Sequence, residues 1–222
     1  MMGRLDGPRP AVTDAVADAL IERLVPKIQA LKVGPASDRS SEMGPVVTAA
    51  ARDKIMGYIG AGEKEGAKIV VDGRDFNAPQ GFEDGYFVGP TLIDNVTPDM
   101  SIWQEEIFGP VLSVVCVKGY EDGVEMINAN PFANGTAIYT RDGGAARQFQ
   151  FDIEVGMVGI NVPIPVPLAY HTFGGWKRSA FGDTNQHGPE GVKFWTRIKT
   201  VTSRWPSGGV KEGSSFVIPT MK

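Results

Sequence analysis

Residues 111–162 read VLSVVCVKGYEDGVEMINANPFANGTAIYTRDGGAARQFQFDIEVGMVGINV, in which short apolar runs alternate with amphipathic segments. Three of these runs have the character of buried strands: Val111–Val117, Thr136–Thr140 and Met157–Val162. Residues 121–129 and Ala145–Phe151 lie between them and have helical character. The order strand, helix, strand, helix, strand predicts an α/β fold with a mostly parallel sheet and crossover helices.

The carboxyl ends of parallel strands are where ligands gather in such sheets. The last of the three predicted strands ends near Asn161. We therefore expect Asn161 and the loop that follows it to face a ligand.

The first half of the chain carries weaker signals. Apolar positions at helical spacing predict a helix over residues 14–32, with Thr13 or Asp14 as its cap, and Pro26 is expected to kink or split it. A second helix is expected from Thr48 to the Gly60–Gly62 region, followed by a strand over residues 67–71 and an irregular excursion over residues 74–86. Gly60–Gly66 follows a helix and precedes a strand, the reverse of a phosphate-binding loop, so it predicts a helix stop.

Composition excludes several classes of protein. The chain has 222 residues, of which 42% are apolar and 22% charged, as in a globular protein of one or two domains. A formal charge of −4 disfavours nucleic acid and anionic membranes as partners. No apolar stretch approaches the roughly 20 residues of a membrane helix, and residues 1–10 lack the apolar core of a signal peptide. We expect a cytoplasmic protein.

Cys116 is the single cysteine, so it forms no intramolecular disulfide and suits a reducing compartment. Its valine neighbours predict an inert cysteine in the core. With only two histidines, His171 and His187, a Cys/His zinc site is not expected, and neither histidine has an evident nucleophile or carboxylate partner.

Two loops have compositions that suit ligand binding, and a third segment suits assembly. Glu105–Pro110 places two carboxylates and an aromatic residue before a buried strand, and Phe173–Arg178 is a glycine hinge between aromatic and cationic residues. Residues 195–205 resemble a charged edge strand, either of this chain's own sheet or of a sheet in a neighbouring subunit.

At these loops the sequence resembles a known family. Three segments are similar, in order and spacing, to landmarks of the aldehyde dehydrogenase superfamily: EEIFGPV at 105–111, GMVGIN at 156–161 and FGGWK at 173–177. The loop Asn161–His171, the stretch Asn185–Gly188 and the tail at 194–206 resemble the CoA-acylating methylmalonate-semialdehyde (malonate-semialdehyde) dehydrogenase branch.

The resemblance implies an oxidoreductase that uses NAD and coenzyme A, and no metal, to convert a semialdehyde to propionyl-CoA or acetyl-CoA with release of carbon dioxide. It assigns Glu106 to the nicotinamide ribose and Phe108 to packing by the nicotinamide. Phe173, Asn161 and His171 are assigned to the substrate side. The strand at 195–205 is implied to complete a neighbouring subunit's sheet, which favours a homo-oligomer or assembly with a full-length homologue.

The resemblance also implies that this chain is the C-terminal catalytic-domain portion of such an enzyme. It divides the chain into an unmatched segment at 1–14, a partial catalytic domain at 15–192, and an oligomerisation strand and tail at 193–222. In the family the nucleophilic cysteine precedes the helix that starts near Ala15, and an NAD domain precedes both. We expect the isolated chain to have no catalytic residue and no dehydrogenase activity. A gene fragment, a separate assembling subunit and a binding module that kept only the aldehyde pocket remain alternatives.

Overall fold

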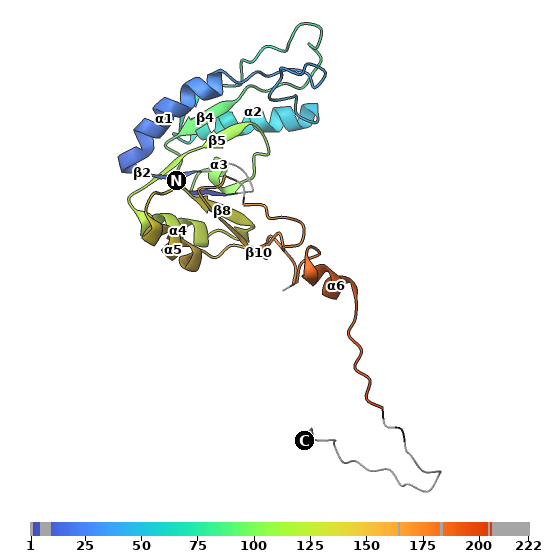
Figure 1. Ribbon diagram of the computed structural model, residues 1–222. Helices are drawn as coiled ribbons and strands as arrows, with labels where there is room; N and C mark the ends of the chain where they lie inside the picture. The colour runs from blue at the N-terminus through green and yellow to red at the C-terminus, as the bar shows by residue number, and fades with distance from the viewer. Residues whose placement is uncertain (1, 5–9, 164, 183, 204, 206–222) are drawn as a thin grey trace.

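The computed structural model describes residues 2–4, 10–163, 165–182, 184–203 and 205. Residues 1 and 5–9 of the predicted N-terminal segment, and the whole of the tail after residue 205, therefore lie outside the described residues. Figure 1 shows a layered body, in which helices flank strands, and an extended C-terminal segment that leads away from it.

A five-stranded sheet forms one half of the body and confirms the α/β prediction. Its strands lie in the order β6 (Val115–Val117), β2 (Ala11–Thr13), β1 (Met2–Arg4), β8 (Gly135–Ile138) and β9 (Met157–Ile160). β6 pairs with β2, and β8 with β9, in parallel. Two helices follow these strands, α4 (Tyr120–Asn128) after β6 and α5 (Gly143–Asp152) between β8 and β9. β1 alone is antiparallel to both of its neighbours.

A three-stranded sheet forms the other half, with β4 (Thr91–Asp94) between β3 (Lys68–Val71) and β5 (Val111–Ser113). The single strand predicted for residues 111–117 is wrong, because the chain changes sheets at Val114. The Val114 amide donates to the Ile93 carbonyl at 2.8 Å, and the Val115 amide donates to the Pro10 carbonyl at 3.1 Å. The apolar run at residues 111–117 therefore contributes one strand to each of the two sheets.

Two long helices come from the first half of the chain. The helix α1 (Asp14–Gln29) runs unbroken through Pro26, which lies in its last turn, so the predicted split does not occur. The helix α2 (Ala49–Lys64) begins with the Thr48 hydroxyl accepting the Ala51 amide at 3.1 Å. It ends just before Gly66, whose φ of +102° confirms the predicted helix stop.

The helices cover both faces of the sheets. Helix α1 contacts β2 and β6 as well as β3 and β4, so it spans the two sheets, and α4 also contacts β2 and β6. Under α5 the ring of Phe149 is fully buried. No described helix has the length and apolar character needed to cross a bilayer.

Short elements complete the described chain. They are α3 (Ser101–Gln104), the paired strands β7 (Phe132–Ala133) and β10 (Trp176–Lys177), and α6 (Pro189–Trp195). The described residues from 196 to 205 form no strand, and the Ile198 and Trp205 side chains are 87% and 88% exposed. An edge strand in this chain's own sheet is therefore not formed (Figure 1). A strand shared with another subunit stays a prediction.

Candidate functional site

The loop that carries Glu106 and Phe108 is anchored on both sides by buried residues. Trp103 in α3 and Ile107 in the loop belong to the core packed against α2. The Pro110 carbonyl accepts the Thr91 amide at 2.9 Å, which joins the end of the loop to β4. The position of the loop is therefore set by its buried residues and by its hydrogen bond to β4.

Within this loop the two predicted cofactor residues point outward. Phe108 has a φ of +54°, and its ring is 81% exposed, which is unusual for a large aromatic side chain. The Glu106 carboxylate is also exposed, two residues away. Gly109 allows the loop to reach α2, since a Cβ there would lie 2.6 Å from Cδ1 of Ile55. An exposed carboxylate and an exposed ring, held by a buried anchor, suit a ligand with both a hydroxylated and a flat aromatic part.

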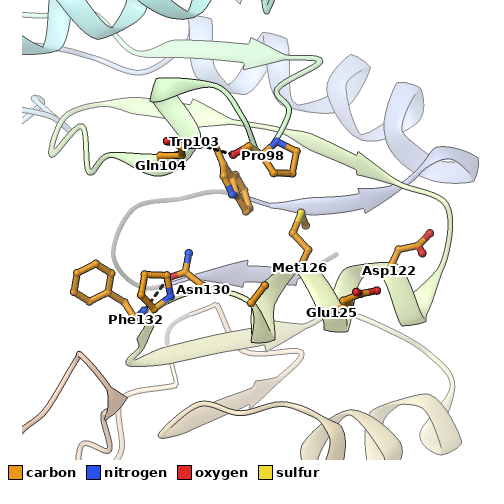
Figure 2. Close-up of a pocket in the computed structure, with 10 residues that line it drawn as sticks. Pro98, Trp103, Gln104, Asp122, Glu125, Met126, Asn130 and Phe132 are labelled. Carbon is orange, nitrogen blue, oxygen red and sulfur yellow. Dashed lines mark hydrogen bonds between the residues drawn. The ribbon is translucent and has the colours of Figure 1, made fainter.

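A cleft of about 490 Å³ lies beside α3, the helix that precedes this loop (Figure 2). Trp103 and Gln104 line it from α3, and Met126 lines it from α4. Figure 2 shows the Trp103 ring and the Met126 side chain extending toward each other across the cleft, with Asp122 and Glu125 at the α4 side. The end of α3 thus borders an open space that has an apolar floor and an acidic edge.

The Asn161 amide joins the carboxyl ends of β8 and β9. Its Oδ1 accepts the Thr140 amide at 3.0 Å, and its Nδ2 donates to the Thr140 carbonyl at 3.1 Å. Its own backbone amide donates to Ile138 at 2.8 Å, and its φ is +58°. Asn161 therefore lies at the predicted edge of the sheet, with its side chain engaged in fixing the strand ends.

The turn at Phe173–Gly175 packs against the start of β9 through glycines. A Cβ on Gly174 would lie 2.5 Å from the carbonyl carbon of Gly156, and Gly174 has a φ of +66°. Asn185 Nδ2 donates to the Gly174 carbonyl at 2.8 Å. Lys177, at the end of the motif, contacts the Glu154 carboxylate at 3.1 Å. The FGGWK motif is thus held by backbone contact and by polar bonds.

The Phe173 ring stacks on His187, with centroids 4.1 Å apart and planes at 28°. Both side chains line a cavity of about 680 Å³, together with Asn185 and Phe194. The structure does not pair Phe173 with His171, whose exposed ring lies against Tyr170 at 4.6 Å. His187 was not among the predicted site residues, although the Asn185–Gly188 stretch that contains it was singled out.

Cys116 is exposed, so the prediction of a core cysteine is wrong. Side chains alternate along a strand, and in β6 Val115 and Val117 face the core while Cys116 faces outward. Partial burial is the main cause that raises the pKa of its thiol, and the carboxylates of Asp94, Asp14 and Asp18 add to it. A raised pKa disfavours the reactive thiolate, which agrees with an inert cysteine for a reason other than burial in the core.

Alkylation of Cys116 by iodoacetamide tests this directly. Because the pKa is raised, the thiol stays protonated at neutral pH, and the rate should still be rising above pH ~8.5, the ordinary value for cysteine. The pH profile can be followed by mass spectrometry, with the urea-unfolded chain as the control. A folded-state profile with its midpoint below that of the unfolded chain would contradict the expectation.

Comparison with known proteins identifies the family. A sequence model described as the aldehyde dehydrogenase family matches residues 5–201. The chain belongs to this family. The match begins earlier than residue 15, where the resemblance was expected to start, and so includes β2.

Similar proteins are dehydrogenases of semialdehydes and other aldehydes. The chain is 55% identical over 210 residues to a malonate-semialdehyde dehydrogenase of Pseudomonas aeruginosa, covering 95% of this chain and 42% of that protein. A structure from Sinorhizobium meliloti 1021, named as a methylmalonate-semialdehyde dehydrogenase and complexed with NAD, is 56% identical with a TM-score of 0.86, over 92% of this chain and 41% of that one. Betaine aldehyde dehydrogenase from Staphylococcus aureus, in complex with NAD+, is 30% identical with a TM-score of 0.76, over 84% and 36%. The chain therefore spans about two fifths of the length of its semialdehyde-dehydrogenase relatives.

Proposed function

We propose that this chain is the C-terminal part of an NAD-dependent, CoA-acylating methylmalonate- or malonate-semialdehyde dehydrogenase. The observation that carries the proposal is the 56% identity and TM-score of 0.86 to the NAD-complexed Sinorhizobium meliloti protein over nearly the whole chain. The overall reaction joins a semialdehyde carboxylate, CoA thiol and NAD+ to give an acyl-CoA, carbon dioxide and NADH. Malonate semialdehyde gives acetyl-CoA, and methylmalonate semialdehyde gives propionyl-CoA.

In this proposal the chain supplies walls and contacts to the active site. The exposed Glu106 carboxylate accepts hydrogen bonds from ribose hydroxyls, and the exposed Phe108 ring packs beside the nicotinamide, which accepts the hydride. Phe173, with His187 behind it, forms an aromatic wall near the aldehyde, and the loop from Asn161 to His171 flanks the aldehyde's path. The nucleophile comes from the remaining part of the enzyme, because Cys116 lies on a sheet edge with a raised pKa.

A chimera tests the proposal. Residues 15–205 of this chain would replace the corresponding segment of the Pseudomonas aeruginosa relative. We expect the chimera to form NADH from malonate semialdehyde only when NAD and CoA are both present, and the isolated chain to form none. Glu106→Gln in the chimera is expected to raise KM for NAD about tenfold without changing the melting temperature, since the carboxylate is exposed.

The matched control in the chimera is Glu121→Gln, which alters an exposed carboxylate in the first turn of α4. It should leave KM for NAD unchanged. A folded chimera that lacks semialdehyde activity would overturn the proposal, and NADH formation by the isolated chain would overturn the claim that this chain lacks the nucleophile.

A second candidate is a non-catalytic subunit that assembles with full-length dehydrogenase chains. The observation that favours it is the extended segment at 196–203, in which Ile198 and Val201 are 87% and 75% exposed. Such a segment is suited to pair with the sheet edge of another chain. Co-purification of this chain with a full-length homologue, lost when residues 196–205 are deleted, would favour this candidate.

A further inference from the structure

The segment Asn185–Gly188, here called the brace, is joined to the turn that carries Phe173. The Asn185 side-chain amide donates to the Gly174 carbonyl at 2.8 Å. The Asn185 Oδ1 also accepts the backbone amide of His187 at 3.3 Å, within the brace itself. One amide side chain therefore fixes both the turn and the residue that stacks on Phe173.

The other end of the brace is joined to the loop Asn161–His171. The Gly188 amide donates to the Ala169 carbonyl at 3.2 Å. A Cβ on Gly188 would lie 2.5 Å from the Tyr170 carbonyl oxygen, and the φ of Gly188 is +67°, so a larger residue does not fit this approach without strain. The brace thus links the two segments that the proposed function places beside the aldehyde.

His187 of the brace supplies the stacking partner of the Phe173 ring. The two planes lie at 28° with centroids 4.1 Å apart, and both side chains are half-buried. Beside this stack lies the cavity of about 680 Å³ that both rings line, and it is far larger than a phenyl ring. Without His187 the Phe173 side chain has room to rotate into this cavity. His187 therefore determines where the Phe173 ring lies.

The position of the Phe173 ring bears on the one difference between the two candidate substrates. Malonate semialdehyde and methylmalonate semialdehyde share an aldehyde and a carboxylate, and the second carries a methyl group on the carbon between them. Polar and charged contacts are therefore common to both substrates, and an apolar contact is needed to distinguish them. Because a methyl group buried against an apolar surface strengthens binding about fourfold, a fixed aromatic wall favours the substrate that carries it.

We propose that His187 is a positioning residue, which holds the Phe173 ring where it receives the methyl group of methylmalonate semialdehyde. The proposal rests on the proposed function for its substrates, whereas the brace rests on the contacts of Asn185, His187 and Gly188. His187 acts through Phe173, so it sets the selectivity between two substrates and leaves the binding of NAD unchanged.

The test measures kcat/KM of the chimera described above for both semialdehydes, with KM for NAD as the internal reference. His187→Ala removes the stack, and we expect it to lower the ratio of kcat/KM for methylmalonate over malonate semialdehyde about fourfold. His187→Phe keeps an aromatic ring in the same place and should restore the ratio. A loss of folded enzyme lowers both values of kcat/KM together, so it does not change their ratio.

Asn185→Asp is a second variant, in which the brace keeps an acceptor and loses a donor. The carboxylate still accepts the His187 amide, but it does not donate to the Gly174 carbonyl. We expect the same fall in the ratio, and faster hydrogen exchange over the Phe173–Gly175 turn in this variant and in His187→Ala. The added charge acts on the carboxylates of both substrates alike, so it does not itself change the ratio.

Phe151→Ala in the chimera is the control, because it removes an exposed aromatic ring from α5, none of whose described residues lines the cavity. It should leave both the ratio and the exchange unchanged. An active chimera in which His187→Ala keeps the original ratio, with or without faster exchange, would overturn the proposal. So would a failure of His187→Phe to restore the ratio.

A different result separates this proposal from the proposed function. A folded chimera that is inactive toward both semialdehydes would overturn the proposed function, and the selectivity assigned to His187 would fall with it. The hydrogen exchange of the same chimera would still decide whether the brace holds the Phe173–Gly175 turn, because that measurement needs no activity.

Discussion

Alanine in place of Gly156 is expected to destabilise the chain by about 3 kcal/mol and to detach the Phe173–Gly175 turn from β9. A Cβ on Gly156 would lie 1.9 Å from the backbone nitrogen of Gly175 and 2.8 Å from the carbonyl carbon of Gly174. These contacts are with backbone, so no side-chain rotation relieves them. Urea unfolding would give the change in stability, and hydrogen exchange over the turn would show its release.

Gly143→Ala is the matched control. Gly143 is the first residue of α5, and a Cβ there meets no atom within 4 Å. The change should alter the free energy of unfolding by less than about 1 kcal/mol, in the stabilising direction, since alanine favours the helix. Equal effects of the two substitutions would mean that the contact between Gly156 and the turn is not the cause.

Phe149→Ala is expected to lower the free energy of unfolding by about 3–5 kcal/mol. The Phe149 side chain is 0% exposed in the core between α5 and the five-stranded sheet, and its ring meets the Tyr120 ring edge-on, with centroids 6.5 Å apart. Removing it leaves a cavity in a core that has few large side chains. Thermal and urea denaturation would measure the loss.

Phe151, two residues along the same helix, is 72% exposed and provides the control. Phe151→Ala removes the same atoms from a helix with the same backbone, and its effect should lie within about 0.5 kcal/mol. A loss of the same size at both positions would indicate that helix propensity, rather than burial, governs the effect.

The sequence predicts those helices and strands whose apolar periodicity lies within a short run of neighbouring residues. Helices α4 and α5 and strands β8 and β9 lie close to their predicted ranges, because apolar periodicity reports which face of an element is buried. The break at Val114 was not predictable in this way, since a continuous apolar run does not show which strand each residue pairs with. The strand β2, three residues long, pairs with β6 about a hundred residues away, and no local signal predicts that contact.

The candidate site was predictable only in part, for a related reason. The Glu105–Pro110 loop carries its information in adjacent residues, so the sequence predicts Glu106 and Phe108 together; the structure exposes both side chains, and their contact with a cofactor stays a prediction. The ring that stacks on Phe173 depends on how the segment around residue 185 packs against the turn at Phe173–Gly175. The Asn185 side-chain amide holds the two segments together by donating to the Gly174 carbonyl. The structure therefore selected His187 over the nearer His171. The core position predicted for Cys116 is wrong because strand side chains alternate, so its valine neighbours in sequence face the other side of β6.

Val114 has a consequence for how the molecule comes apart. Its side chain is fully buried, and it is the single residue between β5 in one sheet and β6 in the other. A connection of one residue does not let one sheet move away from the other while both strands stay paired. Helix α1 also packs against both sheets. The halves are thus expected to lose their structure in one cooperative transition rather than one after the other. A substitution that destabilises either sheet is therefore expected to lower the free energy of unfolding of the whole chain.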